Sequence, residues 1–274
     1  AESLEQLKAR VTSYLDTHLA NDVDQSTLAA SMRYSVLAGG KRLRPTLTLA
    51  TVETFGGELT EDVVRAATAL ELLHTYSLIH DDLPAMDNDD LRRGAPTNHR
   101  KFGAGMATLA GDGLLTLAFQ WVTDNQLPAT VKSQLALELA KAAGPAGMVA
   151  GQARDIEGTG RHLTLDQLRY LHRQKTGALL RYAVLAGGII TAQPAAVQQL
   201  LAQFGSSYGL AFQIYDDLMD VVGTTTTMGK RVGKDAAEQL QQALERAKNA
   251  QAALSQLTGR SFAAYDDFLA YFKL

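Results

Sequence analysis

The sequence predicts an all-α protein with a single domain that spans residues 1–274. Apolar residues recur at helical spacing almost throughout, whereas convincing β-strand alternation is absent. No internal repeat of about 20–50 residues and no linker-like segment divides the chain. A chain of 274 residues is long enough for one large domain or two small ones. We therefore expect one helical bundle, with functional side chains at the ends of its core helices.

In the first half of the chain, capping and helix-breaking residues set the predicted helix ends. Gly39-Gly40 stops the second helix, and Pro45 suits the first turn of the third. Thr60 is the N-cap of a long fourth helix, and Pro84 disfavours helix at the residue before it. We expect helices over residues 4–19, 26–38, 45–55, 61–82 and 102–122, with a polar loop over residues 83–101.

The second half follows the same pattern. Pro128 starts a helix that Gly144-Pro145 breaks, and the capping-box pattern from Thr164 to Gln167 starts the next. Pro194 begins a long helix. We expect helices over residues 128–143, 165–187, 194–222, 235–257 and 261–272, with a polar loop over residues 224–227.

Composition excludes several classes of protein. The chain has no cysteine, which rules out disulfides, a thiol nucleophile and cysteine-ligated zinc. A net charge of −3 gives no electrostatic support for nucleic-acid binding. No stretch approaches the roughly 18 apolar residues of a membrane-spanning helix. The N-terminal segment is acidic and does not look like a signal peptide, so we expect a cytoplasmic protein without stable membrane insertion.

Two groups of aspartates each follow an apolar helical run. The first is Asp81, Asp82 and Asp87, and the second is Asp216, Asp217 and Asp220. Asp216 and Asp220 are four residues apart and share a helix face. Crowded carboxylates are costly to desolvate without a cation. Mg²⁺ takes carboxylates together with phosphate oxygens, so the pattern predicts a diphosphate held by several Mg²⁺ ions.

Two other acidic pairs are expected to be ordinary solvated residues. Asp266-Asp267 lacks a third carboxylate and belongs to an amphipathic terminal helix. Asp89-Asp90 lies in the polar loop, where we expect solvation or support for Arg92 and Arg93.

Basic residues lie at four places near these groups. Lys41, Arg42 and Arg44 precede a helix, and the N-terminus of a helix with cationic side chains binds anions. The other places are Arg92-Arg93, Lys175-Thr176 and Lys230. Separate cationic spots indicate two phosphate-bearing ligands.

These motifs resemble the trans-isoprenyl diphosphate synthase family, and the resemblance is strongest to the bacterial farnesyl type. The family's motifs occur in its order: residues 40–45, Asp81-Asp82 through Gly94, Gly151-Gln152, residues 175–177 and residues 213–220. The resemblance implies an isoprenoid synthase bundle around a deep central cavity, a homodimer, and Mg²⁺-dependent condensation of an allylic diphosphate with isopentenyl diphosphate.

The resemblance also implies roles for individual residues. The two aspartate groups would hold three Mg²⁺ ions, and Arg92, Lys175 and Lys230 would bind the allylic diphosphate. Isopentenyl diphosphate would bind Lys41, Arg44, His74 and Arg93. In catalysis Lys175 would contribute, while Thr176 and Gln213 would stabilise an allylic carbocation.

The residues before the first aspartates predict the product length. Tyr76 and Ser77 lie about one helical turn before Asp81, where bulk limits the product chain in the family. This pattern resembles the farnesyl type, so we expect dimethylallyl and geranyl diphosphate to be extended to the C15 product. A longer, geranylgeranyl product is the alternative, and packing alone is the simpler role for Tyr76.

Other functions leave some of the motifs unexplained. Glu71 and His74 have the spacing of a di-iron helix, but a second copy is missing. His80-Asp81 matches a phosphohydrolase dipeptide, which does not account for the second aspartate group. A terpene cyclase needs no isopentenyl site.

The sequence departs from the family after Asp235. A further loop is compressed at residues 236–240, either by a true deletion or because a mobile loop is omitted from the sequence. That departure is the one feature in favour of a non-catalytic subunit of a heteromeric synthase.

Overall fold

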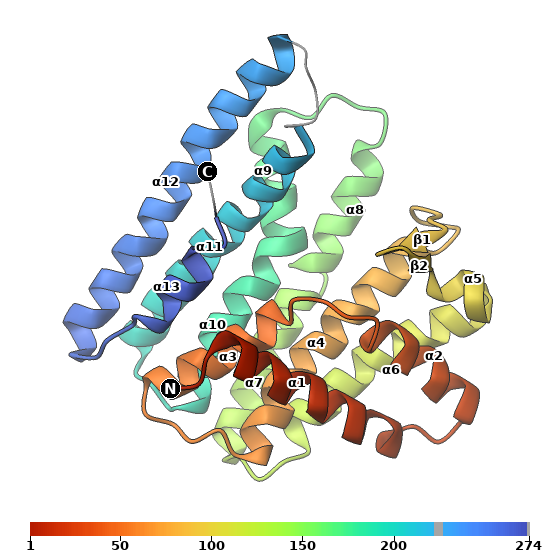
Figure 1. Cartoon of the computed structure of the whole chain (residues 1–274), viewed down its shortest axis with the longest axis horizontal. Coiled ribbons are helices and arrows are strands. Elements are labelled where there is room, and N and C mark those ends of the chain that lie inside the picture. The colour runs from red at the N-terminus through yellow and green to blue at the C-terminus, as the bar shows by residue number, and fades with distance from the viewer. Residues whose placement is uncertain (222–226, 273–274) are drawn as a thin grey trace. The chain divides into compact units, whose positions relative to one another are not determined.

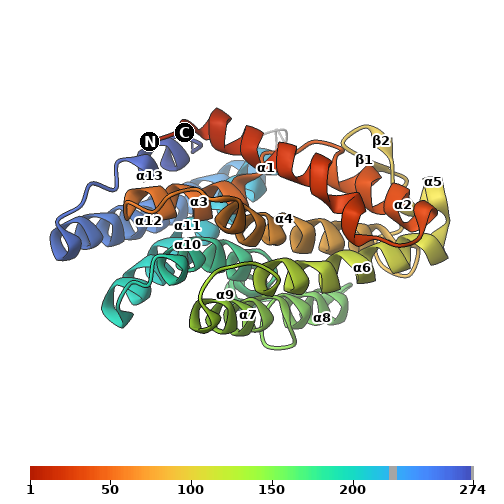
Figure 2. The same ribbon diagram turned by 90° about the horizontal axis from the view of Figure 1, so that it is seen from below.

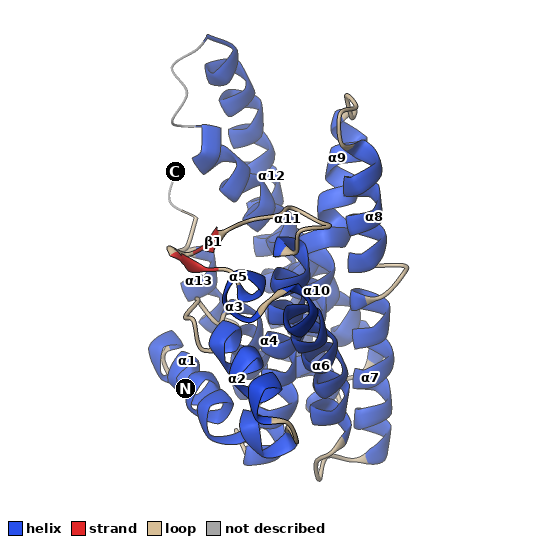
Figure 3. Ribbon diagram, turned by 90° about the vertical axis from the view of Figure 1, so that its right-hand side faces the viewer, coloured by secondary structure: helices blue, strands red, loops and turns tan. Residues whose placement is uncertain are grey.

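The computed structural model describes the backbone of residues 1–221 and 227–272, and the side chains of residues 1–219 and 233–272. Helices make up most of the described chain, as predicted (Figure 3). Contacts group the chain into two compact units. The first comprises residues 1–49 and 58–136, and the second comprises residues 50–57 and 137–274. One domain over residues 1–274 stays a prediction.

The first unit contains the helices expected from the N-terminal capping signals. Its elements are α1 (Leu4–His18), η1 (Leu19–Asp22), α2 (Ser26–Val36), α4 (Glu61–Asp82), β1 (Leu91–Arg92), β2 (Ala95–Pro96), α5 (Asn98–Phe102) and α6 (Ala104–Thr123). Helices α3 (Leu43–Thr54) and α7 (Ala129–Ala143) begin in the first unit and end in the second.

Helix α4 begins and ends where the sequence predicts. The Thr60 hydroxyl accepts a hydrogen bond from the backbone N–H of Val63 at 3.3 Å, which caps the first turn. Leu83 is extended, with ψ 153°, because Pro84 follows it. Most of α4 is buried, and α6 packs along it (Figure 2). The small residues of α6 permit this close approach.

The loop over residues 83–101 is more ordered than expected. Strands β1 and β2 pair antiparallel, with Leu91 opposite Pro96 and Arg92 opposite Ala95, and the short helix α5 follows. Two-residue strands are too short to give an alternation signal in the sequence. Gly103, with φ +88°, ends α5, so α6 begins at Ala104 rather than at Phe102.

The second unit differs from the sequence prediction at three helices. Its elements are α8 (Met148–Gly158), α9 (Leu165–His172), the π-helical turn η2 (Arg173–Gly177), α10 (Ala178–Ile190), α11 (Ala195–Val221), α12 (Thr227–Thr258) and α13 (Ala264–Leu269). Helix α8 was not predicted, because its glycines look like loop residues. The predicted helix over 165–187 is interrupted by η2.

Helix α12 begins earlier than residue 235, where the sequence placed its start. The expected polar loop over 224–227 lies outside the described residues, except for Thr227, which is helical. Residues 236–240, where the family's loop is compressed, lie inside this continuous helix. Among the described residues, no helix is long and apolar enough to cross a membrane.

The core of the second unit is built on α11, which packs against α10 and α12 (Figure 1). Aromatic side chains fill the space beside these helices. Phe204 and Tyr265 stack with their ring centroids 4.3 Å apart, and both are fully buried. The Tyr265 hydroxyl shares a hydrogen bond of 2.7 Å with the Thr51 hydroxyl. Burial raises the pKa of Tyr265, so this hydroxyl stays neutral.

Removal of the Tyr265 hydroxyl should therefore lower stability without changing the fold. We expect Tyr265→Phe to reduce the free energy of unfolding by about 1 kcal/mol, because a buried hydrogen bond is lost while the ring still packs. Urea unfolding monitored by circular dichroism measures the change. Tyr170→Phe is the control, since Tyr170 is 47% exposed. Equal effects of the two substitutions would contradict the role of the buried bond.

Candidate active site

The first aspartate group lies where α4 ends and the chain turns back. The backbone N–H of Asp87 donates to the carbonyl oxygen of Asp81 at 2.9 Å, so the loop folds onto the helix end. Asp82 is buried, Asp81 is partly buried and Asp87 is exposed. This turn gives the three carboxylates different solvation although they are close in sequence.

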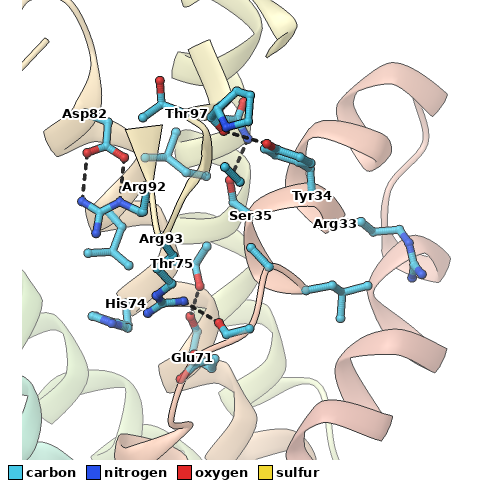
Figure 4. Close-up of a pocket in the computed structure, with 18 residues that line it drawn as sticks. Arg33, Tyr34, Ser35, Glu71, His74, Thr75, Asp82, Arg92, Arg93 and Thr97 are labelled. Atoms are coloured by element: carbon cyan, nitrogen blue, oxygen red, sulfur yellow. Dashed lines mark hydrogen bonds and ion pairs between the residues drawn. The ribbon is translucent and has the colours of Figure 1, made fainter. Parts of the chain in front are cut away.

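Asp82 is held by Arg92, which is the residue expected to bind the allylic diphosphate. The Arg92 guanidinium donates to both carboxylate oxygens, at 2.7 and 2.9 Å (Figure 4). This two-point geometry is strong because the donor and the acceptor are both charged. The hydrogen bond to Asp82 raises the pKa of Arg92. Asp89 and Asp90 are exposed, as expected for solvated residues. Asp90 pairs with Arg100, whereas the negative charge of Asp89 adds to the raised pKa of Arg92.

The donor chemistry at the end of α4 fits Mg²⁺, although its geometry is that of an ion pair. Carboxylate oxygens are the protein ligands that Mg²⁺ prefers. Among the described side chains, no three acidic or histidine residues form a group that could hold a metal. Asp82 would have to exchange Arg92 for the ion, while Asp81 and Asp87 are more accessible.

A cavity of about 440 Å³ lies beside this site within the first unit. His74, Arg93 and Glu71 lie together on one side of it (Figure 4). Arg44 approaches His74, with 3.5 Å between Nη1 and Nε2. The structure thus brings together three of the residues expected to bind isopentenyl diphosphate. Lys41, the fourth, is exposed at the turn before α3.

Arg93 connects this cavity to the turn before α3. Its guanidinium donates to the carbonyl oxygen of Gly39. A Cβ at Gly40 would lie 3.0 Å from Arg93 Nη1, and Gly40 has φ +135°. The backbone conformation therefore favours glycine there, and a Cβ would also press on the Arg93 guanidinium.

His74 is held neutral by its surroundings. Burial is the largest cause of its lowered pKa, and the positive charges of Arg44, Arg93, Arg92 and Arg42 lower the pKa further. A neutral imidazole next to several arginines can still offer one N–H donor to an anion.

Tyr76 and Ser77 differ in what they contact. The Tyr76 ring meets the edge of the His80 ring at a centroid distance of 5.1 Å. His80 Nε2 lies 3.0 Å from the carbonyl oxygen of Thr108, and its ring fills the space that a Cβ at Gly111 would occupy. Tyr76 is therefore braced by α6 through His80. The Ser77 hydroxyl donates to the carbonyl oxygen of His74 at 2.6 Å, within its own helix.

In the second unit, Lys175 and Thr176 lie on the π-helical turn η2. Such turns are rare and frequently mark functional sites. A Cβ at Gly151 would be 2.7 Å from the backbone nitrogen of Lys175, and one at Gly209 would be 2.9 Å from Gly177 Cα. Helices α8 and α11 thus hold η2 between two glycines. This contact explains the role of Gly151, which the sequence indicated only as part of a family motif.

The charged groups around η2 are also paired. Lys175 Nζ binds Asp155 at 2.7 Å. The Gln213 amide donates to Asp217 at 3.2 Å, and His172 Nε2 lies 3.8 Å from the same carboxylate. Burial lowers the pKa of His172, although Asp217 opposes the effect.

The remaining residues of the second predicted group are only partly placed. Asp216 is partly buried on α11 beside Asp217. Asp220 lies on α11 and Lys230 on α12, but both side chains are outside the described residues.

Sequence reasoning missed two residues beside Lys175. Asp155 is four residues after Gly151, and His172 is three residues before Lys175. Helical spacing could have placed His172 near Lys175 once a helix was predicted there. Asp155 could not be found, because α8 was not predicted. By contrast, Asp266 and Asp267 are exposed, as expected.

The sequence and structure both match known prenyl synthases. The sequence model of the polyprenyl synthetase family matches residues 25–273. Farnesyl diphosphate synthase of Geobacillus stearothermophilus is 51% identical over 235 residues, which cover 85% of this chain and 79% of that protein. Farnesyl diphosphate synthase of Bacillus subtilis (strain 168) is 47% identical over 212 residues, covering 76% and 71%.

A solved structure extends the similarity to the fold. The crystal structure of an FPP/GFPP synthase from Zymomonas mobilis, in its apo form, has a TM-score of 0.86 to this chain at 34% sequence identity. The match covers 98% of this chain and 97% of that one.

The lowered pKa of His74 should make stability depend on pH. Below about pH 6.5 the unfolded chain takes up a proton that the folded chain refuses, so the free energy of unfolding falls as the pH falls. The loss should approach about 1.4 kcal/mol per pH unit. Urea unfolding of wild type and His74→Gln at pH 7.5 and 5.5 isolates this contribution, because His172 is common to both. We expect the wild type to lose more stability than the variant, and parallel losses would refute the assignment.

Proposed function

The chain belongs to the polyprenyl synthetase family, and we propose that it condenses isopentenyl diphosphate with dimethylallyl or geranyl diphosphate to give farnesyl diphosphate. The observation that carries this function is the sequence identity to two farnesyl diphosphate synthases, which is 51% for one and 47% for the other. Each match covers most of this chain and most of the other protein. The fold and the cationic cavity agree with such an activity. We further propose that the enzyme is a homodimer.

Isopentenyl diphosphate would bind at the cavity of the first unit. Arg44 and Arg93 supply permanent positive charge there, and neutral His74 supplies one N–H donor. Lys41, at the turn before α3, would reach the same diphosphate. Cationic side chains around an anion provide both affinity and orientation.

The allylic diphosphate would bind Arg92, Lys175 and Lys230. Arg92 pairs with Asp82 and Lys175 pairs with Asp155, so a diphosphate competes with a carboxylate for each of these cations. The pairing with a carboxylate keeps each cation charge-balanced before substrate binds. It also keeps Arg92 in a fixed position, since two hydrogen bonds orient its guanidinium.

We take the two aspartate groups to be the ligands of three Mg²⁺ ions per active site. The residues are Asp81, Asp82, Asp87, Asp216, Asp217 and Asp220. Mg²⁺ bound there supplies positive charge that stabilises the departing diphosphate.

The reaction then follows from the substrates and from the residues beside them. The allylic C–O bond breaks, and the alkene of isopentenyl diphosphate attacks the resulting carbocation to form a C–C bond. The proton lost from the adduct goes to the departed diphosphate, so no protein base is required. Thr176 and the Gln213 amide, which Asp217 orients, would stabilise the cation.

Product analysis tests the proposed reaction. The purified protein would be incubated with Mg²⁺, labelled isopentenyl diphosphate, and dimethylallyl, geranyl or farnesyl diphosphate in separate reactions. We expect C15 from the first two primers and poor use of farnesyl diphosphate. Products of C20 or longer would replace the farnesyl assignment with the geranylgeranyl one. Absence of condensation with all three primers would indicate a non-catalytic subunit.

Tyr76 should limit the product to C15. Its ring is braced through His80 by α6, so it cannot easily yield to a growing chain. We expect Tyr76→Ala to move most of the product to C20 or longer, as measured by chromatography of the dephosphorylated products. Tyr170→Ala, on exposed α9, is the control and should still yield C15. An active Tyr76→Ala enzyme that makes only C15 would show that Tyr76 serves packing alone.

A further inference from the structure

A buried ion pair lies next to the isopentenyl site but has no assigned part in it. Arg42 Nη1 and Glu71 Oε1 are 2.9 Å apart, and their side chains are only 3% and 7% exposed. Arg42 Nε also reaches the Thr12 hydroxyl at 3.4 Å. Burial of two charges is costly, and a buried pair is often no more stabilising than apolar residues of similar size. Its presence here therefore calls for a reason other than stability.

Arg42 fixes the turn that carries two expected substrate ligands. It directly follows Lys41 and is two residues before Arg44. Its backbone is in the left-handed region, with φ +52°, which is uncommon for a residue with a side chain. The Thr46 hydroxyl donates to the Arg42 carbonyl oxygen at 2.8 Å, which ties this strained residue to the first turn of α3. The Arg42 side chain then anchors the whole turn to α4.

Glu71 connects this turn to α4 at the cavity. It is three residues before His74 on α4, so both side chains lie on one face of the helix. Glu71 and His74 both line the 440 Å³ cavity (Figure 4). The Arg44 contact to His74, at 3.5 Å, spans the same two elements. The Arg93 hydrogen bond to Gly39 joins the connection between β1 and β2 to the turn as well.

We propose that Arg42 and Glu71 form a positioning pair for the isopentenyl diphosphate site, holding Lys41 and Arg44 in register with His74 without touching the substrate. The proposal rests on the proposed function, because it takes those residues to be the isopentenyl ligands. The pair acts by geometry: it fixes the distance between the turn before α3 and the middle of α4. Both elements supply groups to one diphosphate, so a small shift weakens several contacts at once.

If the charge of Glu71 were its only effect on the site, its removal would change substrate binding in the opposite direction. A carboxylate beside a diphosphate site repels the substrate, so its neutralisation should strengthen binding. Loss of the positioning contact should weaken binding instead. Glu71→Gln therefore separates the two effects by the sign of the change in KM for isopentenyl diphosphate.

The experiment compares steady-state kinetics and thermal stability for a set of variants. Glu71→Gln and Arg42→Met each break the ion pair, and the double variant R42M/E71M replaces it with an apolar pair. For both single variants we expect KM for isopentenyl diphosphate to rise about tenfold, while KM for geranyl diphosphate stays within about twofold. The double variant should regain the melting temperature but keep the raised KM, since methionines pack without fixing the turn. Arg42→Lys should restore part of the affinity, because a lysine can still reach one carboxylate oxygen.

Arg65→Met is the matched control. Arg65 belongs to the same unit, is 14% exposed and pairs with Asp22 and Asp124, away from the cavity. We expect it to lower the melting temperature and leave both KM values unchanged. This outcome would show that loss of stability alone does not raise KM for isopentenyl diphosphate.

Two results would overturn the positioning role. One is a KM for isopentenyl diphosphate that is unchanged or lower in Glu71→Gln. The other is a double variant that regains wild-type KM together with its melting temperature, since the pair would then be purely structural. If Glu71→Gln does not fold, the double variant still decides the question. Failure of the proposed function is distinguishable, because the wild type itself would not condense the substrates.

Discussion

Charges buried along α4 need partners, because the helix is packed on most sides and water is excluded from its middle. Three ionisable groups on α4 meet this constraint in two ways. Glu71 takes Arg42 and Asp82 takes Arg92, both in close contact. His74, which arginines surround, stays neutral instead. The positions of the turn before α3 and of the hairpin of β1 and β2 therefore depend on which side chain of α4 they neutralise.

In the second unit, close backbone contacts hold the turn η2, which carries Lys175. Glycines on α8 and α11 let both helices touch η2, so the π-helical turn is held from two sides. Lys175 then projects from a rigid element, and Asp155 neutralises it. Side chains on such an element are held more precisely than side chains on a loop. As a consequence, residues 151 and 209 must both be glycine, because a side chain at either position would clash with the backbone of η2.

Each unit holds in an ion pair a cation that we propose binds the allylic diphosphate. The pairs of Arg92 and Lys175 involve partly exposed groups, so a diphosphate can compete for them. Arg42, by contrast, is buried and does not line the cavity. This difference in exposure is what we expect if Arg92 and Lys175 exchange partners during the proposed reaction while Arg42 keeps its partner. The three neighbouring basic residues differ in the same way, since Lys41 is exposed, Arg44 is partly buried and Arg42 is buried.

The sequence by itself determined the helical fold, both ends of α4, and the residue types that we propose bind a diphosphate. These features are local: Thr60 caps its own helix, Pro84 restricts its own neighbour, and aspartates four residues apart share a face. Only the tertiary structure decided which charged side chains pair with each other and where the backbone forms the π-helical turn η2. The sequence left α8 unassigned and continued a helix through η2, because the backbone contacts at Gly151 and Gly209 join elements that are distant in the sequence. Likewise, nothing near Arg42 in the sequence identifies Glu71 as its partner, since that choice depends on which distant charge is buried beside it.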